Sequence, residues 1–294
     1  MTTRPSHARA WVGAARPRTL PAAIVPVVVG TACAEATRAI AWAPALAALG
    51  GALAIQIGTN FANDVYDAER GADGADRVGP PRAVSAGWID ARAMKRAMVG
   101  AFAVACAFGA YLVAVGGWPI AAVGIASIAA GIAYTGGPWP LGYHGLGDAT
   151  VFVAFGLVAV CGTAYVEVGA VPALAIAAAL PVGALATAIL VVNNLRDRVG
   201  DARVGKRTLA VRLGRRGALV EYVLLVAVAY AVPAVLAVAR SPWCALPIAS
   251  LPLAVRELRA LVAAASGGEF KHSLAGTARL LLVHGVLLAV GLCA

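Results

Sequence analysis

Long apolar runs separated by short polar segments organise this chain of 294 residues. Runs of about the length of a bilayer-spanning helix cover 20–34, 44–62, 97–115, 118–134, 146–166, 172–193, 218–238, 243–263 and 273–293. The pattern predicts an all-α integral membrane protein with nine transmembrane helices in a single domain, 1–294. The first run is short unless it begins within 16–19. The eighth run is interrupted by Pro247, Pro252 and Arg256, so the number is fixed only to within one helix.

The basic residues are distributed unevenly between the segments that join these runs. With a cytoplasmic N-terminus, all but three of the 24 Lys and Arg residues fall in cytoplasmic segments; the exceptions are Arg38, Arg240 and Arg279. This asymmetry is the positive-inside pattern, and it predicts a cytoplasmic N-terminus and an exoplasmic C-terminus in the cell membrane. The two longest cytoplasmic segments, 64–95 and 194–217, are expected to cap one central cavity, because loops of this length are usually functional.

Composition supports the membrane assignment and argues against a soluble domain and against a nucleic-acid-binding protein. Hydrophobic residues make up 61% of the chain and charged residues only 13%, about half the charged fraction of a soluble domain. The mean hydropathy is +0.82. The net charge of +10 is explained by the membrane-flanking loops and by contact with membrane lipids, so we expect no nucleic-acid partner. The five cysteines are scattered singly and show no metal or redox spacing.

Two clusters of acids and amides stand out against this apolar background, each at the cytoplasmic end of an apolar run. Their side chains recur at helical spacing and so share a face: Asn60, Asp64 and Asp67 in one, Asn193, Asp197 and Asp201 in the other. Acids in such a segment are costly and indicate function. Hard oxygen ligands of this kind suit Mg²⁺ shared with substrate phosphates. We therefore expect Asn60 and the four aspartates to bind metal, and the aspartates to be catalytic. The simpler interpretation, acids paired with neighbouring arginines, is weakened by the presence of two matched clusters on one side.

Basic and polar residues near these clusters complete a candidate site. Cations of the capping segments suit phosphate oxygens, and the expected diphosphate ligands are Asn63, Arg77, Arg82, Lys206 and Arg207. Lys206, just after Gly205, is also expected to act in catalysis. The expected acceptor and prenyl pocket residues are Arg16, Tyr134 and Asn193. Tyr134 could instead be an ordinary interfacial aromatic, Arg16 a snorkelling anchor, and Asp148 has no explanation from the sequence.

At these residues the chain resembles the UbiA superfamily of intramembrane prenyltransferases, and within it the branch that prenylates 1,4-dihydroxy-2-naphthoate. Four segments carry the resemblance: RPRTLPAAIVP at 16–26, NFANDVYDAERGADGADRVGPPRAVSAG at 60–87, YTGGPWPLGYHGLG at 134–147 and NNLRDRVGDARVGKRTLAVRLG at 193–214. The superfamily motif NDxxDxxxD ends here at Gly71 rather than at an acid. This departure leaves open whether Asp73 or Asn60 completes the first metal site.

The resemblance implies a nine-helix bundle around a central cavity, lateral access for a lipid tail, and Mg²⁺ dependence. The implied reaction is electrophilic substitution on the naphthalene ring by a polyprenyl diphosphate, with loss of diphosphate and CO₂, giving demethylmenaquinone in menaquinone biosynthesis. It implies two substrates, polyprenyl diphosphate and 1,4-dihydroxy-2-naphthoate, and no obligate protein partner. Other acceptors remain open, such as 4-hydroxybenzoate, homogentisate or a porphyrin-derived alcohol. A cation-coupled transporter is disfavoured because its acids would lie near the bilayer midplane.

Overall fold

The computed structural model describes residues 5–38, 40–71, 79 and 81–294, and this part of the chain contains helices and no strand. The amino-terminal half comprises α1 (His7–Ala15), α2 (Pro21–Glu35), α3 (Trp42–Glu69), α4 (Ala91–Gly116) and α5 (Trp118–Ala133). The next helical rod is α6 (Gly147–Val151), the π-helical η3 (Phe152–Val158) and α7 (Ala159–Val168) in succession. The remainder comprises α8 (Ala173–Arg203), α9 (Leu209–Ala239), α10 (Leu251–Ala263) and α11 (Gly267–Cys293). Short 3₁₀ turns are η1 (Pro17–Thr19), η2 (Leu141–Tyr143) and η4 (Pro242–Ser250).

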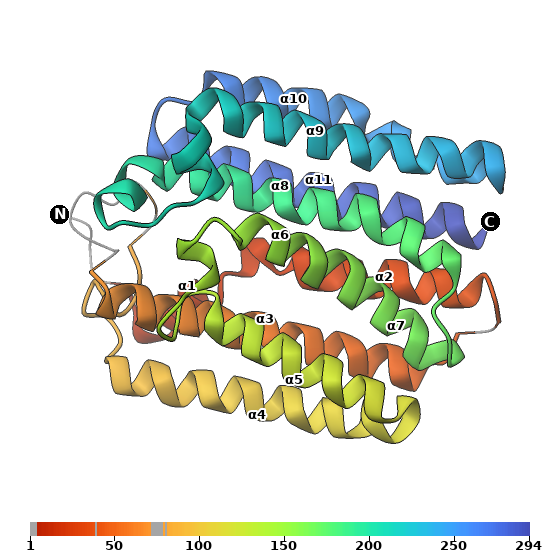
Figure 1. Ribbon diagram of the computed structural model, residues 1–294, viewed down its shortest axis with the longest axis horizontal. Coiled ribbons are helices and arrows are strands. Elements are labelled where there is room, and N and C mark those ends of the chain that lie inside the picture. The colour runs from red at the N-terminus through yellow and green to blue at the C-terminus, as the bar shows by residue number, and fades with distance from the viewer. Residues whose placement is uncertain (1–4, 39, 72–78, 80) are drawn as a thin grey trace.

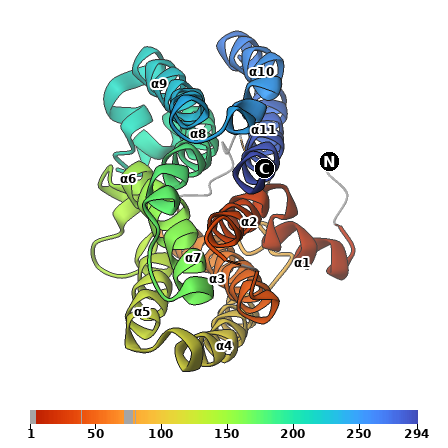
Figure 2. The same ribbon diagram turned by 90° about the vertical axis from the view of Figure 1, so that its right-hand side faces the viewer.

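The long helices run side by side as one bundle (Figure 1). Viewed from its end (Figure 2), α8 to α11 form one side, α3, α4 and α5 the other, and α2 and α7 lie between. The helix α8 is central, with 78% of its apolar window buried, against 17% in α4 and α9. Those two helices therefore present most of their apolar surface outward, as helices that face lipid do.

The expected helices are present, but length and composition do not qualify nine of the described helices as membrane spans. Among the described residues, six helices are long and apolar enough to cross a membrane. A seventh is obtained if 7–19 and α2, which meet at a 46° bend, form one span. The helix α5 is short, and the eighth apolar run is split between η4 and α10, where Pro252 stands in the first turn of the new helix. The all-α membrane fold is confirmed, while a count of nine spans is not.

The two helices that carry the acid clusters end at the same side of the bundle. Both α3 and α8 run toward the end where α1 lies, on the left of Figure 1, while α11 finishes at the opposite end. The helix α8 extends over 31 residues and α3 over 28, about 40 Å or more each at 1.5 Å per residue. Each is long enough to cross a bilayer and still carry its acid cluster at the last turns.

Candidate active site

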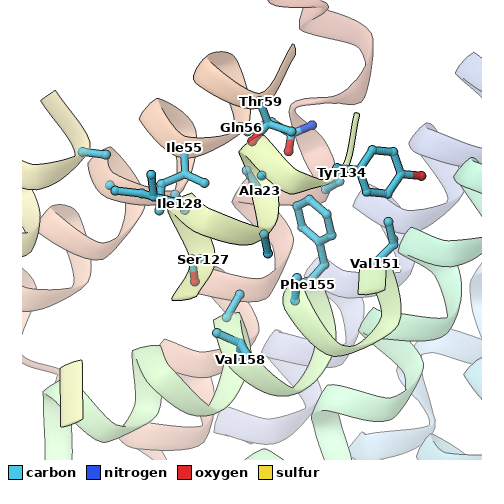
Figure 3. Close-up of a pocket in the computed structure, with 18 of the residues that line it drawn as sticks. Ala23, Ile55, Gln56, Thr59, Ser127, Ile128, Tyr134, Val151, Phe155 and Val158 are labelled. Atoms are coloured by element: carbon cyan, nitrogen blue, oxygen red, sulfur yellow. The ribbon is translucent and has the colours of Figure 1, made fainter. Parts of the chain in front are cut away.

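A cavity of about 530 Å³ opens between α2, α3, α4, α5, the rod from α6 to α7, and α8. Most of its wall is apolar, made of small and branched side chains such as Ala23, Ile55, Val151 and Val158 (Figure 3). At the end where α3 and α8 finish, the wall becomes polar. The charged and amide side chains there are Arg16, Asn60, Asn63, Asp67, Arg82, Asn193, Asn194 and Lys206. An apolar chamber with one charged mouth fits a ligand that has a hydrocarbon part and an anionic part.

On α3, the polar stripe that faces the cavity includes Asn60, Asn63 and Asp67. Their environment fixes each side chain: the Asn60 amide nitrogen donates to the carbonyl oxygen of Ala15 at 3.0 Å, and the Asn63 side-chain oxygen accepts from the Thr135 hydroxyl at 2.8 Å. The amide oxygen of Asn60 remains the atom it can offer to a ligand. Each amide therefore also joins α3 to another part of the polar end.

Asp64 lies on the flank of that stripe and has a different environment from the one expected. Its two carboxylate oxygens accept hydrogen bonds from the backbone N–H groups of Ala83 and Val84, at 3.1 and 2.9 Å, and the residue is 2% exposed. Asp64 does not line the cavity. In this arrangement Asp64 anchors the backbone at 83–84, next to Arg82, and its expected role as a metal ligand stays a prediction.

Asp67 is held on both oxygens by residues from other segments. One carboxylate oxygen pairs with the Arg82 guanidinium at 2.7 Å, and the other accepts a hydrogen bond from the Tyr143 hydroxyl at 2.8 Å. Arg82 also donates to the backbone carbonyl of Asn63. Asp67 is only 1% exposed. Its buried charge is paired and hydrogen-bonded, as a buried carboxylate must be.

Tyr143 joins the two acid clusters, although no sequence pattern singles it out. Its ring lies 5.3 Å from the Lys206 ammonium and 5.2 Å from the Arg70 guanidinium, both within cation–π range. Its backbone carbonyl accepts from the Arg207 N–H at 2.8 Å. Burial, and then the Asp67 carboxylate, raise the pKa of Tyr143, so its hydroxyl stays protonated and donates. The only sequence signal for this residue was its place in the glycine-rich segment 134–147.

The second cluster carries its own counter-charges. Asp197 is paired with the adjacent Arg196 at 2.8 and 2.5 Å, and Arg196 also donates to the side-chain oxygen of Asn193 at 2.8 Å. Asp201 lies 3.6 Å from the Lys206 ammonium, and the Lys206 N–H donates to the Asp201 backbone carbonyl at 2.9 Å. These acids are thus paired with neighbouring basic residues, as the simpler interpretation of the sequence had it. Lys206, the partner of Asp201, lines the same cavity as Asp67.

Tyr134 lines the cavity in a niche formed by glycines of its own segment. A Cβ on Gly147 would come within 2.9 Å of the Tyr134 hydroxyl oxygen, and one on Gly142 within 3.0 Å of the Tyr134 carbonyl oxygen. Arg70 ties the same segment to α3 by donating to the carbonyls of Thr135, at 2.5 Å, and Gly137. The two glycines are needed because no side chain fits between this segment and the tyrosine.

The structure thus gathers most of the expected site residues but not all of them. Arg16, Asn60, Asn63, Asp67, Arg82, Tyr134, Asn193 and Lys206 line the cavity. Asp197 and Asp201 are not lining residues, but each is linked to one, Asp197 to Asn193 through Arg196 and Asp201 to Lys206. The Arg207 side chain is exposed. Arg77 and Asp73 lie outside the described residues. Besides Tyr143, the site contains three residues that the sequence patterns did not predict as site residues: Arg70, Asn194 and Arg196.

The donor set fits a hard divalent cation that is shared with a ligand. Its potential donors are the carboxylates of Asp67, Asp197 and Asp201 and the amide oxygens of Asn60 and Asn193, all oxygen atoms of the kind Mg²⁺ prefers. Within the described part of the chain, no group of three or more Asp, Glu, His or Cys side chains could hold a metal without further ligands. A cation bound here would therefore need oxygens from a phosphate-bearing ligand, the usual arrangement for Mg²⁺.

Comparison with known proteins places this geometry in a family. Residues 23–272 match the model of the UbiA prenyltransferase family. The chain is 42% identical to 1,4-dihydroxy-2-naphthoate octaprenyltransferase of Mycobacterium tuberculosis over 279 residues, 95% of either chain. It is 44% identical to the Escherichia coli enzyme of the same name over 216 residues, 71% of this chain and 70% of that one.

Solved structures with low sequence identity share the fold. A UbiA homologue from Aeropyrum pernix aligns with a TM-score of 0.70 at 17% identity, covering 92% of this chain and 96% of that one. A UbiA homologue from Archaeoglobus fulgidus, solved with DMAPP and Mg²⁺, aligns with a TM-score of 0.65 at 17% identity, covering 95% and 99%. Together with the sequence matches, they show that this chain belongs to the UbiA prenyltransferase family.

Proposed function

We propose that this protein transfers a polyprenyl group from polyprenyl diphosphate to 1,4-dihydroxy-2-naphthoate. The observation that carries the proposal is the cavity, whose apolar wall ends at Arg82, Lys206 and Asp67. The hydrocarbon chain suits the wall and the diphosphate suits the cations. The identity of 42% over 95% of the chain to a 1,4-dihydroxy-2-naphthoate octaprenyltransferase supports the choice of acceptor.

The reaction breaks the bond between the allylic carbon and the diphosphate oxygen, and the electron pair leaves with the diphosphate. Arg82 and Lys206 line the polar end of the cavity. With the diphosphate bound there, these fixed cations would stabilise the negative charge that grows on the leaving group. A bound Mg²⁺, for which this oxygen-rich site is suited, would supply Lewis-acid stabilisation of the same charge. Asp67, held by Tyr143 and Arg82, keeps these groups in position.

The allylic cation then forms a carbon–carbon bond with the electron-rich ring. Loss of the ring carboxylate as CO₂ returns its bonding electrons to the ring, so the products are diphosphate, CO₂ and demethylmenaquinone in its reduced form. The apolar wall keeps water from the cation, and the Tyr134 ring, which lines the cavity (Figure 3), can face it.

We also propose the location and the partners. The apolar helices place the chain in the membrane, and the asymmetry of basic residues supports a cytoplasmic N-terminus, an exoplasmic C-terminus and an active site toward the cytoplasm. Mg²⁺ is the proposed cofactor. The proposed partners are polyprenyl diphosphate, 1,4-dihydroxy-2-naphthoate and membrane lipids.

The test is an assay of the purified protein with polyprenyl diphosphate, Mg²⁺ and a panel of aromatic acceptors. We expect equal amounts of diphosphate and CO₂, with a prenylated naphthalene product identified by mass spectrometry. Diphosphate release without CO₂, with a prenylated 4-hydroxybenzoate as product, would show that the acceptor is wrong. No prenyl transfer to any aromatic acceptor would refute the proposal as a whole.

A further inference from the structure

The polar stripe of α3 extends one turn further into the apolar cavity than the acid cluster does. Gln56 stands four residues before Asn60 on the same helix face, and Gln56, Asn60, Asn63 and Asp67 all line the cavity. At 1.5 Å per residue, Gln56 lies about 6 Å from the level of Asn60 and about 16 Å from that of Asp67 along the helix. It therefore lies beyond the charged mouth, between apolar walls.

The amide of Gln56 has no hydrogen-bond partner among the described residues, unlike the other three members of the stripe. Asn60 donates to Ala15, Asn63 accepts from Thr135, and Asp67 is held by Arg82 and Tyr143. Gln56 and Thr59 both line the cavity, and Figure 3 labels both on the same wall. Gln56 is half-buried in a mainly apolar cavity. A ligand that displaces water from this amide without replacing the hydrogen bonds therefore binds at a cost.

A polyprenyl chain cannot satisfy this amide, since it is a hydrocarbon, and the diphosphate is held too far away. The aromatic acceptor can, because it carries ring hydroxyls. Its reacting carbon must approach the allylic carbon to about 3–3.5 Å. The allylic carbon in turn lies one bond from the diphosphate. A two-ring acceptor in that position would extend along α3 from the level of Asn60 toward Gln56.

We propose that Gln56 is the residue that recognises a ring hydroxyl of the aromatic acceptor. The proposal rests on the proposed function, since it assumes a hydroxylated naphthoate in this cavity. The amide oxygen accepts a hydrogen bond from the hydroxyl, which directs electron density into the ring that attacks the cation. The neutral amide can hydrogen-bond a neutral hydroxyl. Arg16, which also lines the cavity wall, has the charge to pair with the acceptor carboxylate.

The test replaces the amide by an apolar side chain of similar length and changes the acceptor in parallel. Gln56→Met is assayed with 1,4-dihydroxy-2-naphthoate and with the two naphthoates that each lack one of its hydroxyls. We define the preference as the ratio of the two acceptor KM values. For the wild type, we expect the KM of one monohydroxy analogue to be about tenfold higher than that of the dihydroxy acceptor, because about 1.4 kcal/mol for one hydrogen bond corresponds to tenfold in affinity. Gln56→Met should raise the acceptor KM by about tenfold and lose that preference, with the KM for polyprenyl diphosphate unchanged.

Ser127→Ala is the matched control, because it removes a polar group from the same cavity at a position whose hydroxyl points away from Gln56 (Figure 3). We expect this variant to keep the preference for the dihydroxy acceptor. Gln56→Asn, which keeps the amide but shortens it by one methylene, should retain part of the preference and serves if Gln56→Met does not fold.

Two results would overturn the assignment of Gln56. One is a Gln56 variant that keeps the wild-type preference between the acceptors. The other is a rise in the KM for polyprenyl diphosphate with the acceptor KM unchanged, which would place Gln56 against the prenyl chain. Failure of the wild-type protein to prenylate any naphthoate would be distinct from both, since it would refute the proposed function itself.

Discussion

The hydrogen bond from Tyr143 to Asp67 gives a sharp test of how the polar end works. Tyr143→Phe removes the hydroxyl that donates to Asp67 at 2.8 Å and keeps the ring that contacts Lys206 and Arg70. A hydrogen bond to a buried charged group is worth about 1.5–3 kcal/mol. Because Arg82 still holds the other oxygen of Asp67, we expect the lower part of that range. At about 1.4 kcal/mol per tenfold change in rate, kcat/KM for polyprenyl diphosphate should fall about tenfold to thirtyfold.

The assay is the initial rate of diphosphate release as polyprenyl diphosphate is varied at saturating acceptor. Tyr143→Leu, which also removes the ring, should lose a further factor of about ten, because a desolvated cation–π contact is worth roughly 1–2 kcal/mol. The acceptor KM should stay at its wild-type value in both variants. Wild-type kcat/KM in a Tyr143→Phe protein that unfolds at the wild-type temperature would refute the view that this hydroxyl positions Asp67.

Three further variants test other parts of the site. Asp67→Asn, which keeps the shape but removes the charge shared by Arg82 and Lys206, should reduce prenyl transfer at least about a hundredfold, measured by product formation; a loss below tenfold would contradict its role. Asp64→Ala removes two hydrogen bonds to backbone N–H groups, worth roughly 3 kcal/mol together, so limited proteolysis should cleave the segment after α3 faster, and an unchanged cleavage rate would count against the anchoring role. Gly147→Ala should push Tyr134 out of its niche and lower kcat about tenfold or more, because the new Cβ would lie 2.9 Å from the tyrosine hydroxyl; a wild-type kcat would show that the niche can relax.

Helical spacing predicted which end of the bundle carries the chemistry, because both acid clusters close long apolar helices. It did not predict which side chains on those helices face the cavity. The stripe that lines the cavity runs through Gln56, Asn60, Asn63 and Asp67. Asp64, only one residue from Asn63, lies on its flank and bonds a different segment. At 3.6 residues per turn, consecutive side chains point about 100° apart around the helix axis. Neighbouring members of one cluster can therefore contact different segments.

The contacts between segments distant in sequence could not be derived from local pattern. Tyr143 lies 76 residues from Asp67, and nothing in its immediate sequence distinguishes it from an interfacial aromatic. The same limit applies to Arg70, whose contacts with Thr135 and Gly137 depend on how α3 packs beside the segment after α5. The apolar runs predicted the helices. They did not predict where a run is interrupted, as between the 3₁₀ segment η4 and α10 just before Pro252, and such interruptions decide how many helices are long enough to cross a membrane.

The π-helical segment Phe152–Val158 influences which residues of the rod from α6 to α7 face the cavity. Val151 before this segment, Phe155 within it and Thr163 after it all line the same chamber. Each residue of a regular helix turns the chain by about 100°. Deleting one residue from the regular turns of α7 that follow would therefore rotate the rest of this wall by about that angle, away from the chamber. Along this stretch the chain tolerates exchanges of side chain more readily than changes of length, so insertions and deletions should be excluded from it in any redesign of the pocket.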